Sequence, residues 1–267
     1  MSKLSPVALM LAYFVALFLL LPLIAVIPVS FTPARFLSMP GNIWSLRHYL
    51  ELIDNPAWRN SAWLSLQIGG LSAAIATPLA LAFSLGIWMF RPRIANLLFG
   101  FVLLPMVAPP VVSAITMYFC LISLSKLYAA IGYDTWIGVA MAHAVISAPF
   151  AVVMISVALS QVDRRIDLAA RGCGATLAQR VFKVILPNIR FGIVTAAFLA
   201  FMISWEEIGV TLFITSVNAV TLPRMMWMGL RDNIDPAIAA ISVVLIAVVI
   251  VATLTRRALV AWRSRKA

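Results

Sequence analysis

The chain has 267 residues, of which 63% are hydrophobic and only 11% are charged, and its mean hydropathy is +1.04. Soluble proteins carry about 25% charged residues, so this composition excludes an ordinary soluble domain and indicates an integral membrane protein. The formal net charge of +11 argues for short basic loops beside anionic lipid rather than for a nucleic-acid partner.

Six apolar runs follow one another along the chain, and each is long enough for a membrane-spanning helix of about 20 residues. We expect these helices at residues 6–30, 60–90, 94–122, 135–160, 190–214 and 236–256. Transmembrane strands would instead give alternating segments of about ten residues. The first run exceeds the apolar core of a signal peptide and has no clear cleavage site after it, so we expect it to be retained. The expected fold class is an all-α membrane protein with a single transmembrane domain over residues 1–267.

The segment between the first two spans, residues 31–58, is the longest one expected outside the membrane. Its stretch WSLRHYLELIDNPAW predicts a short interfacial helix, with His48 as a solvated loop histidine. Asn55-Pro56, Asp134-Thr135 and Asp235-Pro236 each place a capping side chain just before a span, which predicts helix starts there.

Prolines and one histidine stand out inside the spans. Pro105, Pro109 and Pro110 remove backbone donors from the third run and predict a kink or a break. That bend would suit the wall of a pathway, and an effect on packing alone is about equally consistent with it. His143 lies within the fourth run, where we expect a neutral histidine that hydrogen-bonds a neighbouring helix.

The distribution of basic residues sets the expected orientation. With the N-terminus inside, 14 of the 20 basic residues fall on the cytoplasmic side. They are Lys3, Arg91, Arg93, Arg164, Arg165, Arg171, Arg180, Lys183, Arg190, Arg256, Arg257, Arg263, Arg265 and Lys266. The positive-inside rule therefore predicts that both termini are cytoplasmic.

Residues 161–189, between the fourth and fifth runs, predict a folded cytoplasmic elbow. Asp163 to Cys173 should form a short helix that is broken at Gly172 and Gly174. Thr176 followed by Gln179 is a capping-box pattern that opens a second helix, and Leu186-Pro187 is expected to end it. An Arg-rich topological loop would explain the charge of this segment but not its capping box, glycines and Leu-Pro pair. The tip of the elbow carries small residues that a partner can approach closely: Ala169, Ala170, Gly174 and Ala175.

The spacing within this elbow resembles the EAA loop of ATP-binding-cassette importer permeases. That pattern is Glu-Ala-Ala, three residues, Gly, nine residues, Ile or Val, one residue, Leu-Pro. Ala169-Ala170, Gly174, Val184 and Leu186-Pro187 occupy the matching positions. Leu168 stands at the Glu position, and Asp167 supplies an acid one place earlier, so the loop must hold its shape without that Glu or use Asp167 instead.

Further stretches resemble the spermidine/putrescine-type branch of these permeases: NSAWLSL, FMISWEEIGVTLFITS and TLPRMMWMGLRDNIDP. The resemblance implies the type I importer fold with six transmembrane helices, in a bacterial inner membrane. It implies that the elbow docks the ATPase through Asp167, Ala169, Ala170, Gly174, Ala175, Leu186 and Pro187. The implied partners are a homologous second permease, two ATP-binding subunits and an extracytoplasmic solute-binding protein.

The chain has no G-x-x-x-x-G-K-[ST] phosphate loop. We therefore expect a transport subunit rather than an enzyme, with no cofactor or metal of its own, and with ATP and Mg²⁺ bound by the ATPase subunits. A membrane-embedded enzyme is disfavoured further because no Ser/His/Asp set or metal-ligand spacing is present in the sequence.

Trp205, Glu206 and Glu207 lie within the fifth run, about 22 Å from its cytoplasmic end at 1.5 Å per residue. Acids at that depth are costly and face a cavity or the bundle interior. On a continuous helix they point about 100° apart, so one would face the pathway while the other pairs with Arg224 or Arg231.

A carboxylate beside a tryptophan favours an ammonium substrate, such as a polyamine or a related cationic amine. A purely structural or gating role for the two acids carries nearly equal weight, and iron(III) or an organophosphonate stays open as the solute. The leading hypothesis is a pore-forming subunit that works by alternating access driven by partner ATPases. The alternative is an ion-coupled secondary transporter or channel that uses the same acids.

Overall fold

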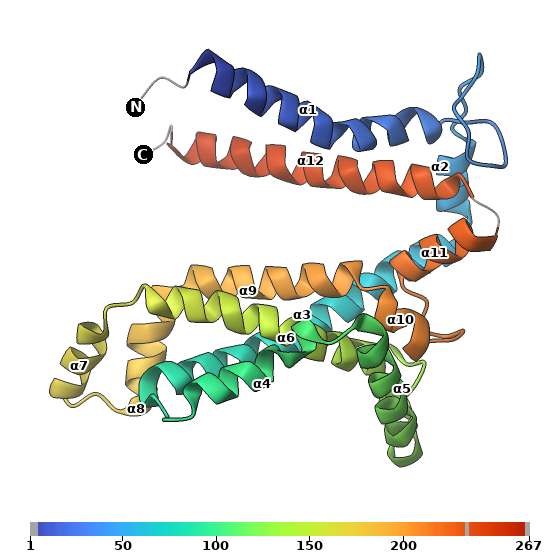
Figure 1. Ribbon diagram of the computed structural model, residues 1–267. Helices are drawn as coiled ribbons and strands as arrows, with labels where there is room; N and C mark the ends of the chain where they lie inside the picture. Colours follow the sequence, from blue (N-terminus) through green and yellow to red (C-terminus); the bar gives the residue numbers. More distant parts are fainter. Residues whose placement is uncertain (1–4, 233–234, 265–267) are drawn as a thin grey trace. The chain divides into compact units, whose positions relative to one another are not determined.

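The computed structural model describes residues 5–232 and 235–264, which form helices without a strand (Figure 1). Lys3, Arg265 and Lys266, which the orientation prediction includes, lie outside these residues. The elements are α1 (Pro6–Val29), α2 (Arg47–Asp54), α3 (Pro56–Phe90), α4 (Ala95–Val107), α5 (Pro110–Leu127), the 3₁₀ helix η1 (Ala129–Ile131), α6 (Trp136–Ser160), α7 (Arg164–Gly172), α8 (Leu177–Gln179), the π-helix η2 (Arg180–Ile185), α9 (Leu186–Glu206), α10 (Gly209–Ile214), α11 (Leu222–Asp232) and α12 (Ala237–Ser264).

Six stretches of the described chain are long and apolar enough to cross a membrane, which confirms the predicted fold class. They are Pro6–Val29, Pro56–Phe90, Pro110–Leu127, Trp136–Ser160, Leu177–Glu206 and Ala237–Leu259. The shorter apolar helix α4 accompanies them.

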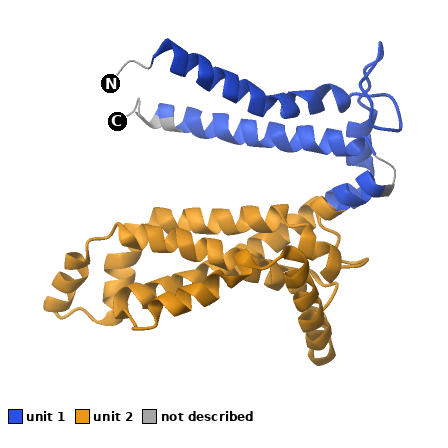
Figure 2. Ribbon diagram, in the orientation of Figure 1, with its two compact units in different colours: residues 1–60, 225–267 blue, residues 61–224 orange. Residues whose placement is uncertain are grey.

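The chain divides into two compact units, residues 1–60 with 225–267 and residues 61–224 (Figure 2). In unit 1, α12 packs against both α1 and α2. Most apolar side chains of α1 are exposed, and no residue of its span is buried in the described chain. Both units contribute spans, and a single transmembrane domain over the whole chain stays a prediction.

The core of unit 2 is built on close contacts between small residues. α6 runs alongside α9, α4 packs on α6, and α10 packs on α5 (Figure 1). Ala76 of α3, Ala144 of α6 and Ala200 of α9 meet in one buried cluster. Gly192 of α9 lies so close to Ala158 of α6 that an added Cβ would come within 2.3 Å of it. Small residues let transmembrane helices approach closely and gain packing energy.

The third run contains a full break, as its prolines predict. α4 ends at Val107, Ala108 and Pro109 are extended, and α5 begins at Pro110. Pro109 and Pro110 divide the run into two helices. The membrane span of this run is therefore α5 rather than the expected helix over residues 94–122.

The fifth run differs from the prediction at both ends. A continuous helix over 190–214 is wrong because Glu207 is extended, with φ −71° and ψ 114°, so that α9 ends at Glu206. Leu186-Pro187 is also not a stop, since one helix continues from Leu177 to Glu206. Pro187 lies two residues after the end of η2, and the wide π-helical turns before it leave room for the proline ring.

The predicted capping side chains are confirmed at three helix starts. Asn55 Oδ1 accepts a hydrogen bond from the backbone N–H of Ala57 at 2.9 Å, and Asp235 Oδ1 accepts from that of Ala237 at 2.9 Å. Thr135 Oγ1 accepts from the N–H of Gly138 at 3.0 Å. Each bond satisfies one of the backbone donors that a helix start leaves free.

Candidate functional site

The elbow between α6 and α9 has the secondary structure that its sequence predicts. Asp163 caps α7 by accepting from the N–H of Arg165 at 2.9 Å. The chain then turns through Gly174, whose φ of +78° lies in the left-handed region that favours glycine. Thr176 and Gln179 form both halves of the capping box at the start of α8.

A buried ion pair holds the two arms of the elbow together. Asp167 of α7 is 8% exposed, and its carboxylate accepts from Arg180 Nε at 2.7 Å and from Arg180 Nη2 at 2.6 Å. Bidentate pairs of this kind are strong and fix the relative orientation of both groups. Sequence reasoning identified Asp167 and missed Arg180, because the two residues lie 13 positions apart on different helices.

The residues expected to dock an ATPase fall into two groups. Ala169 and Gly174 are exposed and Ala170 and Ala175 half-buried at the end of α7 and in the turn. Leu168, at the position where the family has Glu, is 60% exposed. Leu186 instead packs against the buried Ile185 cluster, and Pro187 is exposed in the long helix, so this pair belongs to the spanning helix rather than to the tip.

The break between α9 and α10, formed by Glu207 and Ile208, gives the two acids different surroundings. Glu207 Oε1 accepts from the N–H of Val210 at 2.8 Å, which caps α10. Glu206 is exposed, and no hydrogen bond or ion pair joins its carboxylate to another residue of the described chain. Arg224, one of the two bases expected to pair with these acids, donates from Nη1 to Thr215 Oγ1 instead.

His143 of α6 joins the two sides of this break. Its Nδ1 lies 2.8 Å from Ser204 Oγ on α9, and its Nε2 lies 2.9 Å from Thr211 Oγ1 on α10. Thr211 Oγ1 donates its own hydrogen to the carbonyl of Glu207, so it accepts from Nε2–H, and Nδ1 accepts from Ser204. The expected hydrogen bond from His143 to a neighbouring helix is confirmed.

The broken third and fifth runs meet at this point. A Cβ added to Gly209 would lie 3.8 Å from Cβ of Pro110, the first residue of α5. Trp205, half-buried beside the break, stacks on Phe201 with the ring centroids 5.9 Å apart. Non-helical backbone at membrane depth is tolerated only where it is buried in protein or lines a water-filled cavity. An exposed acid beside such backbone is therefore a candidate for a solute pathway.

Asp134 fixes the loop that follows α10. Its carboxylate oxygens accept the backbone N–H groups of residues 216–219 at 2.7–3.2 Å, and Asn218 Nδ2 at 2.9 Å. Burial raises the pKa of Asp134. The backbone hydrogen bonds lower it by more than burial raises it, so the pKa of Asp134 lies below its ordinary value of 3.8. Local sequence gives no signal for this role, since the partners lie 82 to 85 residues away.

Residues 76–266 match the sequence profile of one protein family, described as the binding-protein-dependent transport system inner membrane component. The chain belongs to this family. This permease is 28% identical over 236 residues to the putrescine transport system permease protein PotI of Escherichia coli strain K12, across 87% of this chain and 83% of that protein. It is 31% identical over 196 residues to a probable molybdenum ABC transporter permease protein of Haloferax volcanii, across 71% and 72% of the two chains.

Solved structures support the same fold. A bacterial ABC transporter involved in the import of the acidic polysaccharide alginate superposes with a TM-score of 0.67 at 16% identity, covering 96% of this chain and 99% of that one. An amino acid ABC transporter with histidines gives a TM-score of 0.55 at 18% identity, covering 82% and 98%. The permease is thus a multi-pass membrane subunit of an ABC importer, which works with ATPase and solute-binding partners.

Proposed function

We propose that this permease imports a polyamine or a related cationic amine, with Glu206 as the acid that meets the solute. The observation that carries this proposal is the exposed Glu206 carboxylate beside the helix break, while Glu207 is engaged as the cap of α10. A protonated amine compensates a carboxylate at this depth by charge pairing, which is strong where water is scarce. The half-buried Trp205 offers a cation–π surface next to it.

Relatives support this choice of substrate class. The spermidine/putrescine transport system permease protein PotC of Haemophilus influenzae is 26% identical over 232 residues, and the PotI relative carries the name of a putrescine system. A molybdenum-type relative is similarly close in identity, but an oxyanion would be repelled by Glu206. An organophosphonate meets the same objection, and iron(III) is the remaining solute that a carboxylate attracts.

We further propose that the permease pairs with a homologous second permease and docks two ATP-binding subunits, which bind ATP and Mg²⁺. The small residues at the tip of the elbow, with Asp167 behind them, fit the groove of an ATPase closely. Both termini and the elbow would then be cytoplasmic, as the positive-inside rule favours. A binding protein would deliver the solute from the other side.

The mechanism follows from one continuous helix. The stretch Leu177–Glu206 has 30 residues, so it measures about 45 Å and joins the elbow to the break. Closure of the ATPase dimer would move the elbow, and this helix would carry the movement to Glu206 and the break. Alternating access would result from that rigid-body shift. Membership of an ABC permease family does not favour an ion-coupled secondary transporter or a channel.

The test uses the complete transporter, reconstituted in proteoliposomes with its cognate binding protein. We expect uptake of putrescine or spermidine to need ATP, and Glu206→Gln to lower it at least tenfold, about 1.4 kcal/mol, without loss of assembly. Asp54→Asn, which removes an exposed acid outside the spans, serves as the matched control and should transport normally. Unchanged polyamine uptake in Glu206→Gln, or uptake of molybdate instead of amines, would contradict the proposal.

A further inference from the structure

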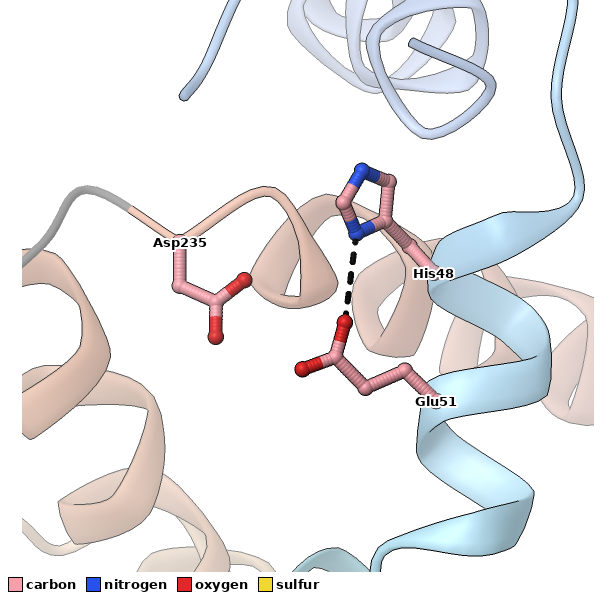
Figure 3. Close-up of side chains that lie close together, drawn as sticks. All are labelled: His48, Glu51 and Asp235. Carbon is pink, nitrogen blue, oxygen red and sulfur yellow. Dashed lines mark ion pairs between the residues drawn. The ribbon is translucent and has the colours of Figure 1, made fainter. Parts of the chain in front are cut away.

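His48, Glu51 and Asp235 bring three potential metal ligands together within unit 1 (Figure 3). His48 and Glu51 lie one turn apart on α2, and Asp235 lies just before α12, which packs against α2. One ligand atom from each residue lies within 4.8 Å of the others. The three residues are far from the elbow and the helix break in sequence, and the proposed transport function uses none of them.

The histidine of this cluster is not the solvated side chain that the sequence predicts. His48 is only 2% exposed, because the loop after α1 covers it and its Nε2 lies 3.0 Å from the carbonyl oxygen of Ala34. A carbonyl oxygen only accepts, so Nε2 carries a hydrogen, and Nδ1 of the neutral ring presents a lone pair. That Nδ1 is buried and has no hydrogen-bond partner in the described chain.

The unpartnered nitrogen points at an acid. Nδ1 lies 3.6 Å from Oε2 of Glu51, and Figure 3 shows the imidazole and the Glu51 and Asp235 carboxylates turned toward the same space. Two electron-rich atoms facing each other repel. A protonated ring would attract the carboxylate instead of repelling it. The distance of 3.6 Å between Nδ1 and Oε2 is nevertheless longer than the 2.7–3.2 Å of a good N–H···O bond. A cation held between the three groups satisfies all of them at once.

We propose that His48, Glu51 and Asp235 bind a divalent metal ion of the zinc type. Two ligands of a tetrahedral ion at about 2.1 Å lie about 3.4 Å apart, close to the observed 3.6 Å between Nδ1 and Oε2. A metal-bound histidine usually donates its other N–H to a backbone carbonyl, which is the arrangement of His48 and Ala34. Imidazole with carboxylates suits Zn²⁺ and its neighbours, whereas Ca²⁺ and Mg²⁺ take oxygen ligands.

The cap of α12 is compatible with this role. Asp235 Oδ1 accepts from the N–H of Ala237 at 2.9 Å, and a carboxylate retains enough lone pairs to bind a metal as well. The Glu51 side chain is 41% exposed, so solvent reaches the site and water completes the coordination. A bound ion would link α2 to the start of α12 and, through His48, to the loop after α1.

The experiment uses the complete, nucleotide-free transporter in lipid nanodiscs after treatment with a chelator. Zn²⁺ alone and Co²⁺ alone are titrated by calorimetry and by thermal unfolding, with Ca²⁺ and Mg²⁺ as selectivity controls. We expect Zn²⁺ to raise the Tm of the native protein and Co²⁺ to give visible absorption bands. His48→Gln should weaken Zn²⁺ binding by at least about 10–100-fold, the loss that removal of an outer-shell partner alone produces.

Two further variants keep the test decisive if His48→Gln fails to assemble. Asp235→Asn retains a good helix cap but loses the ligand charge, and should also weaken Zn²⁺ binding. Asp54→Asn removes an exposed acid from the same helix and should bind Zn²⁺ normally. The proposal would be overturned if Zn²⁺ did not stabilise the native protein. It would also be overturned if Zn²⁺ stabilised His48→Gln and Asp235→Asn as much as it stabilises the native protein. Stability that changes with pH in chelator but does not respond to Zn²⁺ would overturn it too, since a protonated His48–Glu51 pair would explain it.

Discussion

At the scale of single residues, the neighbouring acids Glu206 and Glu207 illustrate how backbone conformation assigns function. Had α9 continued, the two carboxylates would have projected from one helix about 100° apart. The extended Glu207 caps the following helix α10 instead, and His143 contacts Ser204 and Thr211 on either side of the break. These contacts stabilise the break without using Glu206, so its carboxylate is free for the solute contact proposed above.

Asp134 gives a prediction about pH at the same scale. Its folded-state pKa lies below the ordinary 3.8, so its stabilising contribution is present above pH 3.8 and is lost as the pH falls through the folded value. Asp134→Asn should therefore unfold at a lower temperature than the native protein at pH 7. The difference in Tm should shrink as the pH falls below about 4. Thermal unfolding in nanodiscs from pH 7 to pH 3 measures this, and a difference that grows with acidity would contradict it.

At the scale of elements, local chemistry explains which features the sequence predicts well. The caps at Asn55 and Thr135 and the capping box at Thr176 depend on side chains within three residues of their partners. The same holds for the break at Pro109, because proline removes its own backbone donor. The six apolar runs therefore predict the fold, and the local pattern of the elbow predicts its helices and caps.

Features that depend on distant residues were not predictable in this way. At the end of α9, His143 of α6 contacts Ser204 and Thr211, which lie 61 and 68 residues away, and the Asp134 carboxylate binds a loop 82 residues on. The sequence predicts a solvated His48, whereas the loop at Ala34 covers it in the structure. Pro187 failed to end its helix because π-helical turns precede it. In each case tertiary contacts or a neighbouring turn outweigh the local pattern.

The Asp167–Arg180 pair leads to a prediction for the elbow as an element. Both side chains are nearly buried, with 11% and 12% exposed, so removal of either leaves a charge without its partner, which costs about 1–3 kcal/mol. Asp167→Asn and Arg180→Gln should each lower solute-stimulated ATPase activity severalfold while membrane insertion is retained. The double variant should be less impaired than the sum of the two, since it leaves neither charge unpaired.

Arg171 provides the matched control for this cycle. It is an exposed arginine of the same elbow, and Arg171→Gln changes the net charge as Arg180→Gln does. Arg171→Gln should therefore leave the coupling between solute and ATP hydrolysis intact. Additive effects of Asp167→Asn and Arg180→Gln would show that the ion pair does not act as a unit.

At the scale of the whole subunit, the proposed mechanism requires that movement of the elbow reach the helix break. The elbow turns at Gly174, and the helix from Leu177 to Glu206 starts three residues later. The shape of that turn therefore sets the direction in which the long helix leaves the elbow. A small change of backbone angle at Gly174 becomes a large displacement about 45 Å away.

Gly174 and Gly172 allow this idea to be tested with two matched variants. An added Cβ meets no atom within 4 Å at either position, but only Gly174 has a positive φ. Gly174→Ala forces alanine into the left-handed region, at a cost of about 1–2 kcal/mol, and the turn relaxes to another shape. We expect Gly174→Ala to reduce uptake and solute-stimulated ATPase activity together, while Gly172→Ala retains both. Both activities are measured in proteoliposomes with the cognate binding protein. Equal activity in the two variants would show that the backbone conformation at Gly174 does not set the coupling. Loss of activity in Gly174→Ala alone would assign the coupling to the turn at Gly174.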